Sequence, residues 1–259
     1  MILAVDIGNT NVAFALMNER DAFESQLRFP TDKRRTARDF MVGFEALLAM
    51  HQFDFSQVDG AIVSSVVPEL TDHVVQSIVD KIHKDPLLVS HELDLGFFIH
   101  IDTPHALGAD LIADAAGALG SYSGNLAVFD LGTATTCSII RNNGSHPVYE
   151  GSLILPGVAP SQDALSARCS QLPFISFEDA PALIGKNTVD AMQSGAVNAT
   201  AAMIDGLIQR IETELHDSVT PVITGGISKL VAPACTKEVH RSPMLIFEGL
   251  WDLYHRNCS

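Results

Sequence analysis

The stretch ILAVDIGNTNVAFAL, residues 2–16, decides the fold class of this chain. Two apolar runs flank one polar segment, D-I-G-N-T-N at residues 6–11. One interpretation is a tight β-hairpin, because Gly and Asn tolerate the positive φ angles of such turns. The other is a phosphate-binding hairpin, in which Gly8 lets backbone N–H groups approach an anion and Asp6 holds a metal ion or its water. Further donors would then come from Asn9, Thr10 and Asn11.

The same pattern returns later in the chain. Residues 126–140 read LAVFDLGTATTCSII, again an apolar strand, an Asp-x-Gly turn and a second apolar strand. Two such hairpins near the starts of the two halves predict a duplicated domain. A third glycine turn, VITGGIS at residues 222–228, also follows an apolar strand. Three polar turns that end strands favour a nucleotide held between two domains.

The composition narrows the possible functions. The chain has 259 residues, of which 47% are hydrophobic, and a net charge of −15. That acidity argues against a nucleic-acid partner, which requires a basic surface, and we interpret the basic residues at 33–38 as a solvated helix face. We expect no membrane partner and a cytoplasmic location, because no apolar run approaches the ~18 residues of a membrane span and no signal peptide is evident. The four cysteines lack C-x-x-C spacing and fit free thiols.

Apolar periodicity predicts an α/β chain in which each half runs β-β-β-α-β-α-β. In the first half, we expect a strand near residues 27–28 and then a helix over 36–52, with Thr36 as a possible N-cap. A strand over 60–70, closed by a Ser/Pro turn, follows this helix. A helix over 71–83, capped by Thr71, and a short strand over 86–90 complete the first half. In the second half, we expect helices over 106–122, 188–215 and 244–257. The predicted domains are residues 1–116 and 117–259.

This order resembles the paired ribonuclease-H-like domains of the superfamily that contains acetate and sugar kinases, heat-shock ATPases and actin. Within it, the chain is similar to the type III pantothenate kinases, also called the Bvg accessory factor family. The matching motifs lie in family order across nearly the whole chain: D-I-G-N-T-N at 6–11, S-S-V-V-P at 64–68, P-H-A-L-G-A-D at 104–110, D-L-G-T-A-T-T at 130–136, I-G-K-N-T at 184–188, T-G-G at 224–226 and E-G-L-W-D-L-Y-H-R-N at 248–257.

The resemblance implies transfer of the γ-phosphoryl group of ATP to the primary hydroxyl of pantothenate, the first step of coenzyme A biosynthesis. It assigns ATP binding to the first hairpin and to Thr133. It also implies that Asp130 holds a monovalent cation, K⁺ or NH₄⁺, and that Mg²⁺ accompanies the nucleotide near Asp6. The hairpin residues concerned are Asp6, Ile7, Gly8, Asn9, Thr10, Asn11, Val12 and Ala13.

Asp110, in the G-A-D motif, is the candidate catalytic base. The residues alone favour an acid at a helix start, where the helix dipole stabilises a carboxylate, and the resemblance implies the catalytic role. Asp114 lies one turn further along the same face, but no family motif includes it. The resemblance assigns pantothenate binding to Gly108, Ala109, Asp110, Leu111 and Thr188. Thr188 is also expected to be the N-cap of the long helix.

Three positions depart from the family pattern, and these departures concern the acceptor pocket more than the nucleotide site. Arginine usually follows G-A-D, and Leu111 stands there; Ile101 replaces a common aromatic residue, and Ser152 a common glycine. Leucine cannot offset the carboxylate of pantothenate, so the phosphate-binding hairpins match the family better than the acceptor pocket does. The alternative function is therefore a nucleotide-binding regulatory paralogue with little or no kinase activity. A third possibility is a kinase for another small molecule. By resemblance we also expect a homodimer.

Overall fold

The computed structural model describes residues 1–32, 36, 38–39, 42–43, 55–142, 146–177 and 182–258. They form two compact units. The first contains residues 1–121 and 245–259, and the second contains residues 122–244. These units differ from the sequence-predicted division at residue 116, because the C-terminal helix belongs with the first unit. The helix predicted over 36–52 lies largely outside the described residues, and at its start the Thr36 hydroxyl accepts a hydrogen bond from the Asp39 N–H at 3.2 Å.

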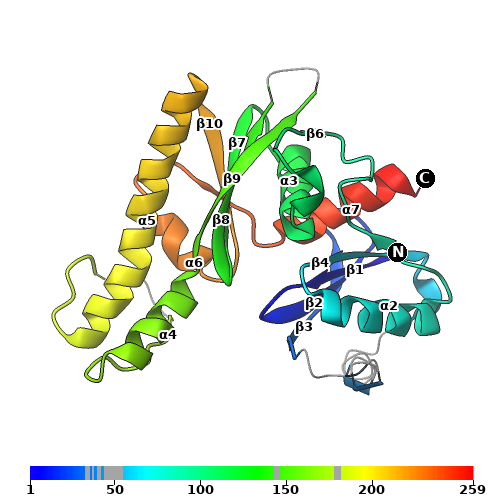
Figure 1. The fold of residues 1–259 in the computed structure, drawn as a ribbon, viewed down its shortest axis with the longest axis horizontal. Helices are drawn as coiled ribbons and strands as arrows, with labels where there is room; N and C mark the ends of the chain where they lie inside the picture. Colours follow the sequence, from blue (N-terminus) through cyan, green and yellow to red (C-terminus); the bar gives the residue numbers. More distant parts are fainter. Residues whose placement is uncertain are drawn as a thin grey trace. The chain divides into compact units, whose positions relative to one another are not determined.

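The first unit is built on a mixed sheet (Figure 1). Its strands are β1 (Ile2–Ile7), β2 (Asn11–Met17), β3 (Phe23–Pro30), β4 (Gly60–Ser65) and β5 (Leu87–Leu88), in the order β3-β2-β1-β4-β5. The first three are antiparallel neighbours, whereas β4 and β5 continue the sheet in parallel. The remaining elements are η1 (Phe55–Gln57), α2 (Pro68–Ile82), β6 (Phe98–Ile99), η2 (Pro104–Ala106), α3 (Ala109–Ser121) and α7 (Leu245–Asn257).

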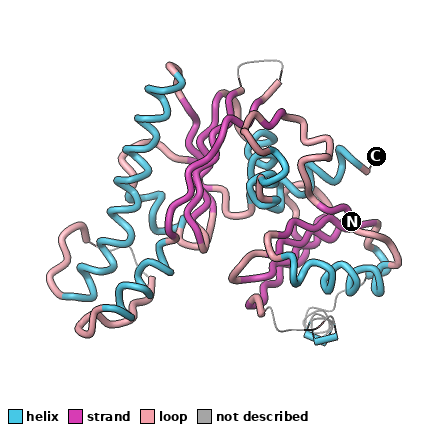
Figure 2. The backbone as a smooth tube through the Cα atoms, viewed as in Figure 1, coloured by secondary structure: helices cyan, strands magenta, loops and turns pink. Residues whose placement is uncertain are grey.

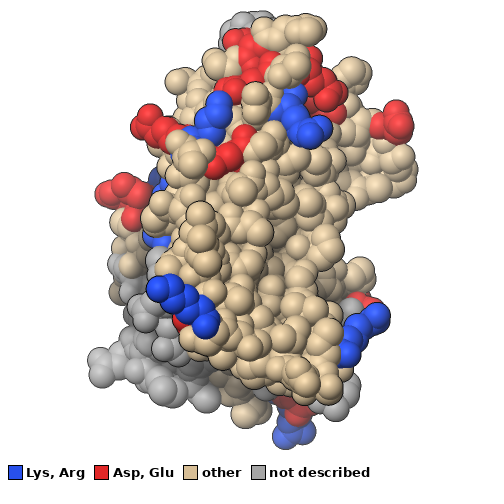
Figure 3. Space-filling view, turned by 90° about the vertical axis from the view of Figure 1, so that its left-hand side faces the viewer, with Lys and Arg blue, Asp and Glu red and all other residues tan. Residues whose placement is uncertain are grey.

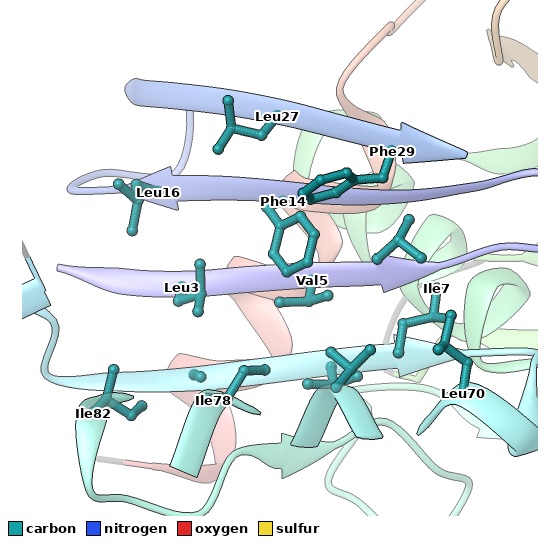
Figure 4. Packing of buried hydrophobic residues seen from close by; sticks show 14 of the residues in the cluster. Leu3, Val5, Ile7, Phe14, Leu16, Leu27, Phe29, Leu70, Ile78 and Ile82 are labelled. Atoms are coloured by element: carbon teal, nitrogen blue, oxygen red, sulfur yellow. The ribbon is translucent and has the colours of Figure 1, made fainter. Parts of the chain in front are cut away.

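Alternation along the strands gives this sheet two apolar faces. On one face, side chains such as Leu3, Val5 and Phe14 pack with Val74 and Ile78 of α2 (Figure 4). Phe14 meets Phe29 edge to face, with ring centroids 5.8 Å apart. The helices α3 and α7 pack together and cover the opposite face (Figure 1).

Close approach of α3 and α7 depends on two glycines. A Cβ on Gly117 would overlap the Leu245 carbonyl oxygen and lie 2.9 Å from the Gly249 backbone nitrogen. A Cβ on Gly249 would overlap the Ala113 carbonyl oxygen. The backbones of the two helices therefore touch directly, which explains why a helix at the end of the sequence belongs to the first unit.

The start of α2 differs from the prediction. The helix begins at Pro68, not at Thr71, and its N-cap residue Val67 makes no side-chain cap hydrogen bond. The proline occupies the first turn, where its missing N–H costs nothing and its fixed φ suits a helix. Thr71 instead lies inside the helix, where its hydroxyl donates to the Val67 carbonyl at 3.0 Å.

The second unit repeats the topology of the first. Its strands are β7 (Asn125–Leu131), β8 (Ala134–Arg141), β9 (Val148–Pro156), β10 (Val219–Thr224) and β11 (His240–Arg241), ordered β11-β10-β7-β8-β9. Read in chain order, the strands of each unit follow the arrangement 3-2-1-4-5, and in both units the last two strands are parallel to the first. The remaining elements are α4 (Val158–Arg168), α5 (Thr188–Leu215), α6 (Ser228–Val231) and η3 (Ala232–Ala234) (Figure 2). The predicted α/β duplication is therefore confirmed.

The core of the second unit lies between its sheet and α5. Val197, Ala201 and Ile204 of α5 pack against Phe129 of β7 and Ile223 of β10. No helix among the described residues is both long enough and apolar enough to cross a membrane. All four cysteines are free thiols, as expected from their spacing.

Candidate active site

The turn of the first hairpin is held by a hydrogen bond within the turn and by two hydrogen bonds from Thr31. Gly8 N–H donates to the Asn11 carbonyl at 2.9 Å, which closes the turn. Thr31, directly after β3, donates through its N–H to the Thr10 carbonyl at 2.8 Å and through its hydroxyl to the Gly8 carbonyl at 2.6 Å. Asn9 and Thr10 remain exposed at the tip. The structure thus offers a fixed turn with exposed polar groups, an arrangement suited to an anion.

Asp6 lies one residue before the end of β1 and is half-buried. In the parallel register of β1 and β4, it stands opposite Ser64. The Ser64 hydroxyl donates to Asp6 Oδ1 at 3.3 Å. A Cβ on Gly8 would lie 3.9 Å from Asp6 Oδ2, so the second carboxylate oxygen lies toward the turn.

The second hairpin repeats this construction around Asp130. Gly132 N–H donates to the Ala134 carbonyl at 3.1 Å, and Thr133 is exposed at the turn. In the parallel register of β7 and β10, Asp130 stands opposite Thr224. Gly225 follows with φ +88, and a Cβ there would lie 2.6 Å from Asp130 Oδ1. Only a glycine permits this approach, so the T-G-G turn encloses the carboxylate of Asp130.

The turn at Pro156 and Gly157 packs against the second hairpin. Gly157 precedes α4, and a Cβ on it would overlap the carbonyl oxygens of Gly132 and Thr133. The turn therefore supports the backbone next to Thr133, a residue predicted to contact ATP.

Asp110 is the second residue of α3 and is half-buried. Its Oδ1 accepts a hydrogen bond from the Leu111 N–H at 2.8 Å. Burial raises the pKa of Asp110 above its ordinary value, although hydrogen bonds from the backbone partly oppose the shift. A carboxylate with a raised pKa is better matched to proton transfer near neutral pH.

Gly108 lies against the Asp110 carboxylate and near Val66, which follows β4. A Cβ on Gly108 would collide with Asp110 Oδ1 and would lie 3.7 Å from Val66 Cγ1. Ser64, two residues before Val66, contacts Asp6. Residues 64–66 of the first unit therefore include one residue that contacts Asp6 and another that lies near Gly108, two residues before the candidate base.

The other predicted acceptor residues have different environments. Ala109 and Leu111 are buried, each with 9% of its surface exposed. Thr188 is exposed and belongs to the second unit. It is the first residue of α5 but not its N-cap: Asn187 holds that position, and its side chain accepts from the Asp190 N–H at 2.9 Å. The predicted capping role of Thr188 is therefore wrong, because the amide one residue earlier takes it.

Three residues of this region were missed by sequence reasoning: Thr31, Ser64 and Gly225. Ser64 lies in the S-S-V-V-P motif near the end of β4, and Gly225 lies in the T-G-G motif directly after β10. The signal that could have identified them is this position, because each of these strands is parallel to a strand that carries an acid. Finding Thr31 required the antiparallel register of β3. Within the described ranges, the structure contains no group of three or more His, Cys, Asp or Glu residues placed to hold a metal ion. A cation at Asp6 or Asp130 would thus need ligands besides such side chains.

The fold and these turns define the class of protein. The chain is an α/β protein with two ribonuclease-H-like units, the architecture of the actin-like ATPases. Solved structures with the same fold include the activator of 2-hydroxyisocaproyl-CoA dehydratase from Clostridium difficile with bound ADPNP, at TM-score 0.56 and 12% identity over 98% of this chain and 93% of that one. Another is the ethanolamine utilization protein EutJ from Carboxydothermus hydrogenoformans, at TM-score 0.55 and 12% identity over 97% and 89% of the two chains.

Sequence comparison identifies the family. The family model for type III pantothenate kinase matches residues 2–210. The type III pantothenate kinase of Phenylobacterium zucineum is 36% identical over 99% of this chain and 98% of its own length. That of Hyphomonas neptunium is also 36% identical, over 99% of this chain and 100% of its own length. The chain belongs to the type III pantothenate kinase family.

Proposed function

We propose that this protein transfers the γ-phosphoryl group of ATP to the primary hydroxyl of pantothenate, giving 4'-phosphopantothenate and ADP. The observation that carries the proposal is the matching Asp-x-Gly turn in each unit, together with the half-buried acid Asp110 in the first. Phosphoryl transfer needs a held phosphate chain, charge neutralisation and a group that receives the acceptor proton, in one place. The same reaction is the first step of coenzyme A biosynthesis, which we place in the cytoplasm.

In this proposal the phosphates of ATP bind to the turns of the hairpins. Backbone N–H groups and side chains from Asp6 to Ala13 contact them in the first unit, and the Thr133 hydroxyl contacts them from the second. Asn9, Thr10 and Thr133 are exposed at the turns, which supports this role. Mg²⁺ commonly binds through one or two carboxylates together with substrate phosphates. Asp6 fits that pattern, since its Oδ2 lies toward the Gly8 turn, and bound Mg²⁺ would neutralise phosphate charge.

Asp130 is the proposed ligand of a monovalent cation, K⁺ or NH₄⁺. Its carboxylate is enclosed by Gly132 and Gly225, whose Cβ atoms would lie 3.3 Å from Oδ2 and 2.6 Å from Oδ1. Glycine at both positions lets the two turns lie directly against the carboxylate. Backbone carbonyls at the two turns could complete an oxygen-ligand site.

Asp110 is the proposed base. The acceptor oxygen forms a bond to the γ-phosphorus while the bond to the β–γ bridging oxygen breaks and ADP leaves. The hydroxyl proton passes to a carboxylate oxygen of Asp110. Gly108 allows this carboxylate to lie against the chain, because any side chain at residue 108 would occupy the place of Oδ1.

For the acceptor we propose contacts from Gly108, Ala109, Asp110, Leu111 and Thr188. Leu111 gives no charge or hydrogen-bond donor to the pantothenate carboxylate. This buried apolar side chain also favours the second candidate function, a nucleotide-binding regulatory paralogue with an altered acceptor pocket. Steady-state ADP release separates the two: the kinase proposal requires release that depends on pantothenate and saturates with it, whereas the paralogue binds ATP without such release.

We further propose that the protein is a homodimer that associates through the second unit. Figure 3 faces the side on which α4 and α5 lie, and charged side chains are sparse over its broad central area. Between Asp190 and Asp205, α5 has no charged residue. Exposed large apolar side chains of this unit are Ile154, Leu165, Phe174, Leu183, Ile184 and Val189. These exposed apolar side chains, on the unit whose longest helix has an uncharged stretch, support an interaction surface there.

The homodimer is tested by measuring mass in solution by light scattering. Ile184, of which 78% is exposed, is the position to change. Ile184→Asp should give monomers at concentrations where the natural chain is dimeric. A natural chain that is monomeric at high concentration would contradict the proposed dimer. It would not affect the kinase proposal, which is tested separately by ADP release.

A further inference from the structure

Two neighbouring serines end β4, and their hydroxyls contact different partners. Ser65 Oγ lies 2.6 Å from Thr71 Oγ1 and accepts from the Val67 N–H at 3.2 Å, so it contributes to the start of α2. Ser64 Oγ donates to Asp6 Oδ1 at 3.3 Å. Ser64 is completely buried. Its hydroxyl thus reaches the acid of the first hairpin and leaves the start of α2 to its neighbour.

The second unit carries a hydroxyl at the matching place. Thr224 of β10 stands opposite Asp130 of β7 in the parallel register, just as Ser64 of β4 stands opposite Asp6 of β1. Only 6% of the surface of Thr224 is exposed. Burying a hydroxyl without a compensating hydrogen bond is unfavourable. A position that served packing alone would accept alanine or valine, the residues found elsewhere along β4. A buried hydroxyl residue stands opposite the acid in both sheets, and in the first unit its hydroxyl donates to the carboxylate, which indicates a role tied to that acid.

Orientation of the carboxylate is the role that the geometry allows. Ser64 holds Oδ1, while Oδ2 lies toward Gly8 at the turn. We propose that Ser64 is a positioning residue, which fixes the Asp6 carboxylate so that Oδ2 is presented to magnesium-bound nucleotide. This inference rests on the proposed function of Asp6 in ATP binding. It adds a residue that touches neither the nucleotide nor the acceptor and acts through Asp6.

The test is Ser64→Ala, with Ser77→Ala as a matched control. Ser77 is a completely buried serine of the same unit, but its hydroxyl donates to the His73 carbonyl inside α2. The affinity for Mg²⁺ with a non-hydrolysable ATP analogue is measured by calorimetry, and KM values are measured for ATP and pantothenate. Loss of a hydrogen bond to a charged group predicts about tenfold weaker nucleotide binding in Ser64→Ala. The KM for pantothenate should stay unchanged, and Ser77→Ala should bind nucleotide normally.

Two further variants distinguish positioning from packing. Ser64→Thr keeps the hydroxyl, as Thr224 does in the second unit, and should restore nucleotide affinity. In an Asp6→Asn background, Ser64→Ala should cause little further loss, because the group that it positions is already changed. Additive losses in this cycle would overturn the inference. So would normal binding in Ser64→Ala, or a loss of folding that Ser77→Ala does not share.

The outcomes also separate this inference from the proposed function. If the natural protein binds the analogue but does not phosphorylate pantothenate, the acceptor assignment fails, and the calorimetric comparison still tests Ser64. If the natural protein binds no nucleotide, both the proposed function and the role of Ser64 are wrong.

Discussion

Asp6 and Asp130 occupy the same position in two sheets that share one strand order. Each lies one residue before the end of the first strand of its unit, and each stands opposite a buried hydroxyl residue on the parallel neighbour. A glycine two residues later forms the turn in both units. Although their settings match, the ligands that we propose for them differ: magnesium-bound nucleotide for Asp6 and a monovalent cation for Asp130.

Asp6→Ala should abolish turnover, because a ligand of the metal or its water beside the phosphates is lost. Asp72→Ala is the control, since Asp72 is an exposed acid of α2 in the same unit. The measurement is the rate of ADP release at saturating ATP, Mg²⁺ and pantothenate. Full activity in Asp6→Ala would mean that the first hairpin has only a structural role.

Replacing K⁺ by Na⁺ should lower the rate if Asp130 holds the monovalent cation. A larger, weakly hydrated ion is more easily bound by a site built from oxygens. Rates are measured at constant ionic strength in K⁺, NH₄⁺ and Na⁺ salts, for the natural chain and for Asp130→Asn. The variant should lose the difference among the salts. Equal rates of the natural chain in all three would contradict the proposed cation site.

Asp110→Asn should lower kcat by about 10²–10⁴-fold, the usual contribution of general acid–base catalysis, and leave ATP affinity nearly unchanged. The pH profile gives a second measurement. Burial raises the pKa of Asp110, so kcat/KM should fall with decreasing pH at a value above that of an ordinary Asp. The direction follows because the protonated carboxyl cannot accept the hydroxyl proton. An unchanged kcat in Asp110→Asn would show that Asp110 is not the base and serves only as an acid at the start of α3.

Leu111→Arg should lower the KM for pantothenate by about tenfold, through a charge-assisted hydrogen bond to the acceptor carboxylate. Because Leu111 is buried, the change should also reduce the free energy of unfolding. Kinetics with pantothenate varied and thermal unfolding are measured together, with Leu111→Met as the control of similar volume. A raised KM in a folded variant would indicate a pocket built around Leu111 and a different natural acceptor.

Gly117→Ala and Gly249→Ala should each reduce the free energy of unfolding by about 1–3 kcal/mol, the usual cost of overpacking. Each added Cβ would meet the backbone of the opposite helix. Gly206→Ala is the matched control: it also lies in a helix, but its added Cβ would meet nothing within 4 Å. This control should be neutral or more stable, because alanine favours a helix. Chemical denaturation measures all three, and equal stabilities would contradict direct contact between α3 and α7.

The sequence predicted the hairpins and the duplication because D-x-G turns between apolar strands are local signals. Other features depend on contacts between distant residues. The assignment of α7 to the first unit follows from Gly117 meeting Gly249, and no local pattern reveals that contact. Pro68 was interpreted as the end of a turn, but it starts α2, because proline is compatible with both. The roles of Thr31 and Ser64 required the strand register, which the apolar pattern alone leaves open.

The most direct measurement of the central claim is the mass of the product formed by the purified protein. ATP, Mg²⁺, K⁺ and pantothenate are supplied at saturating concentrations, with Asp110→Asn as the matched inactive variant. The proposed function predicts a pantothenate derivative heavier by one phosphoryl group, formed in equal amount to ADP and nearly absent with the variant. ADP formation without a phosphorylated pantothenate, or no reaction in a protein that binds ATP, would contradict it.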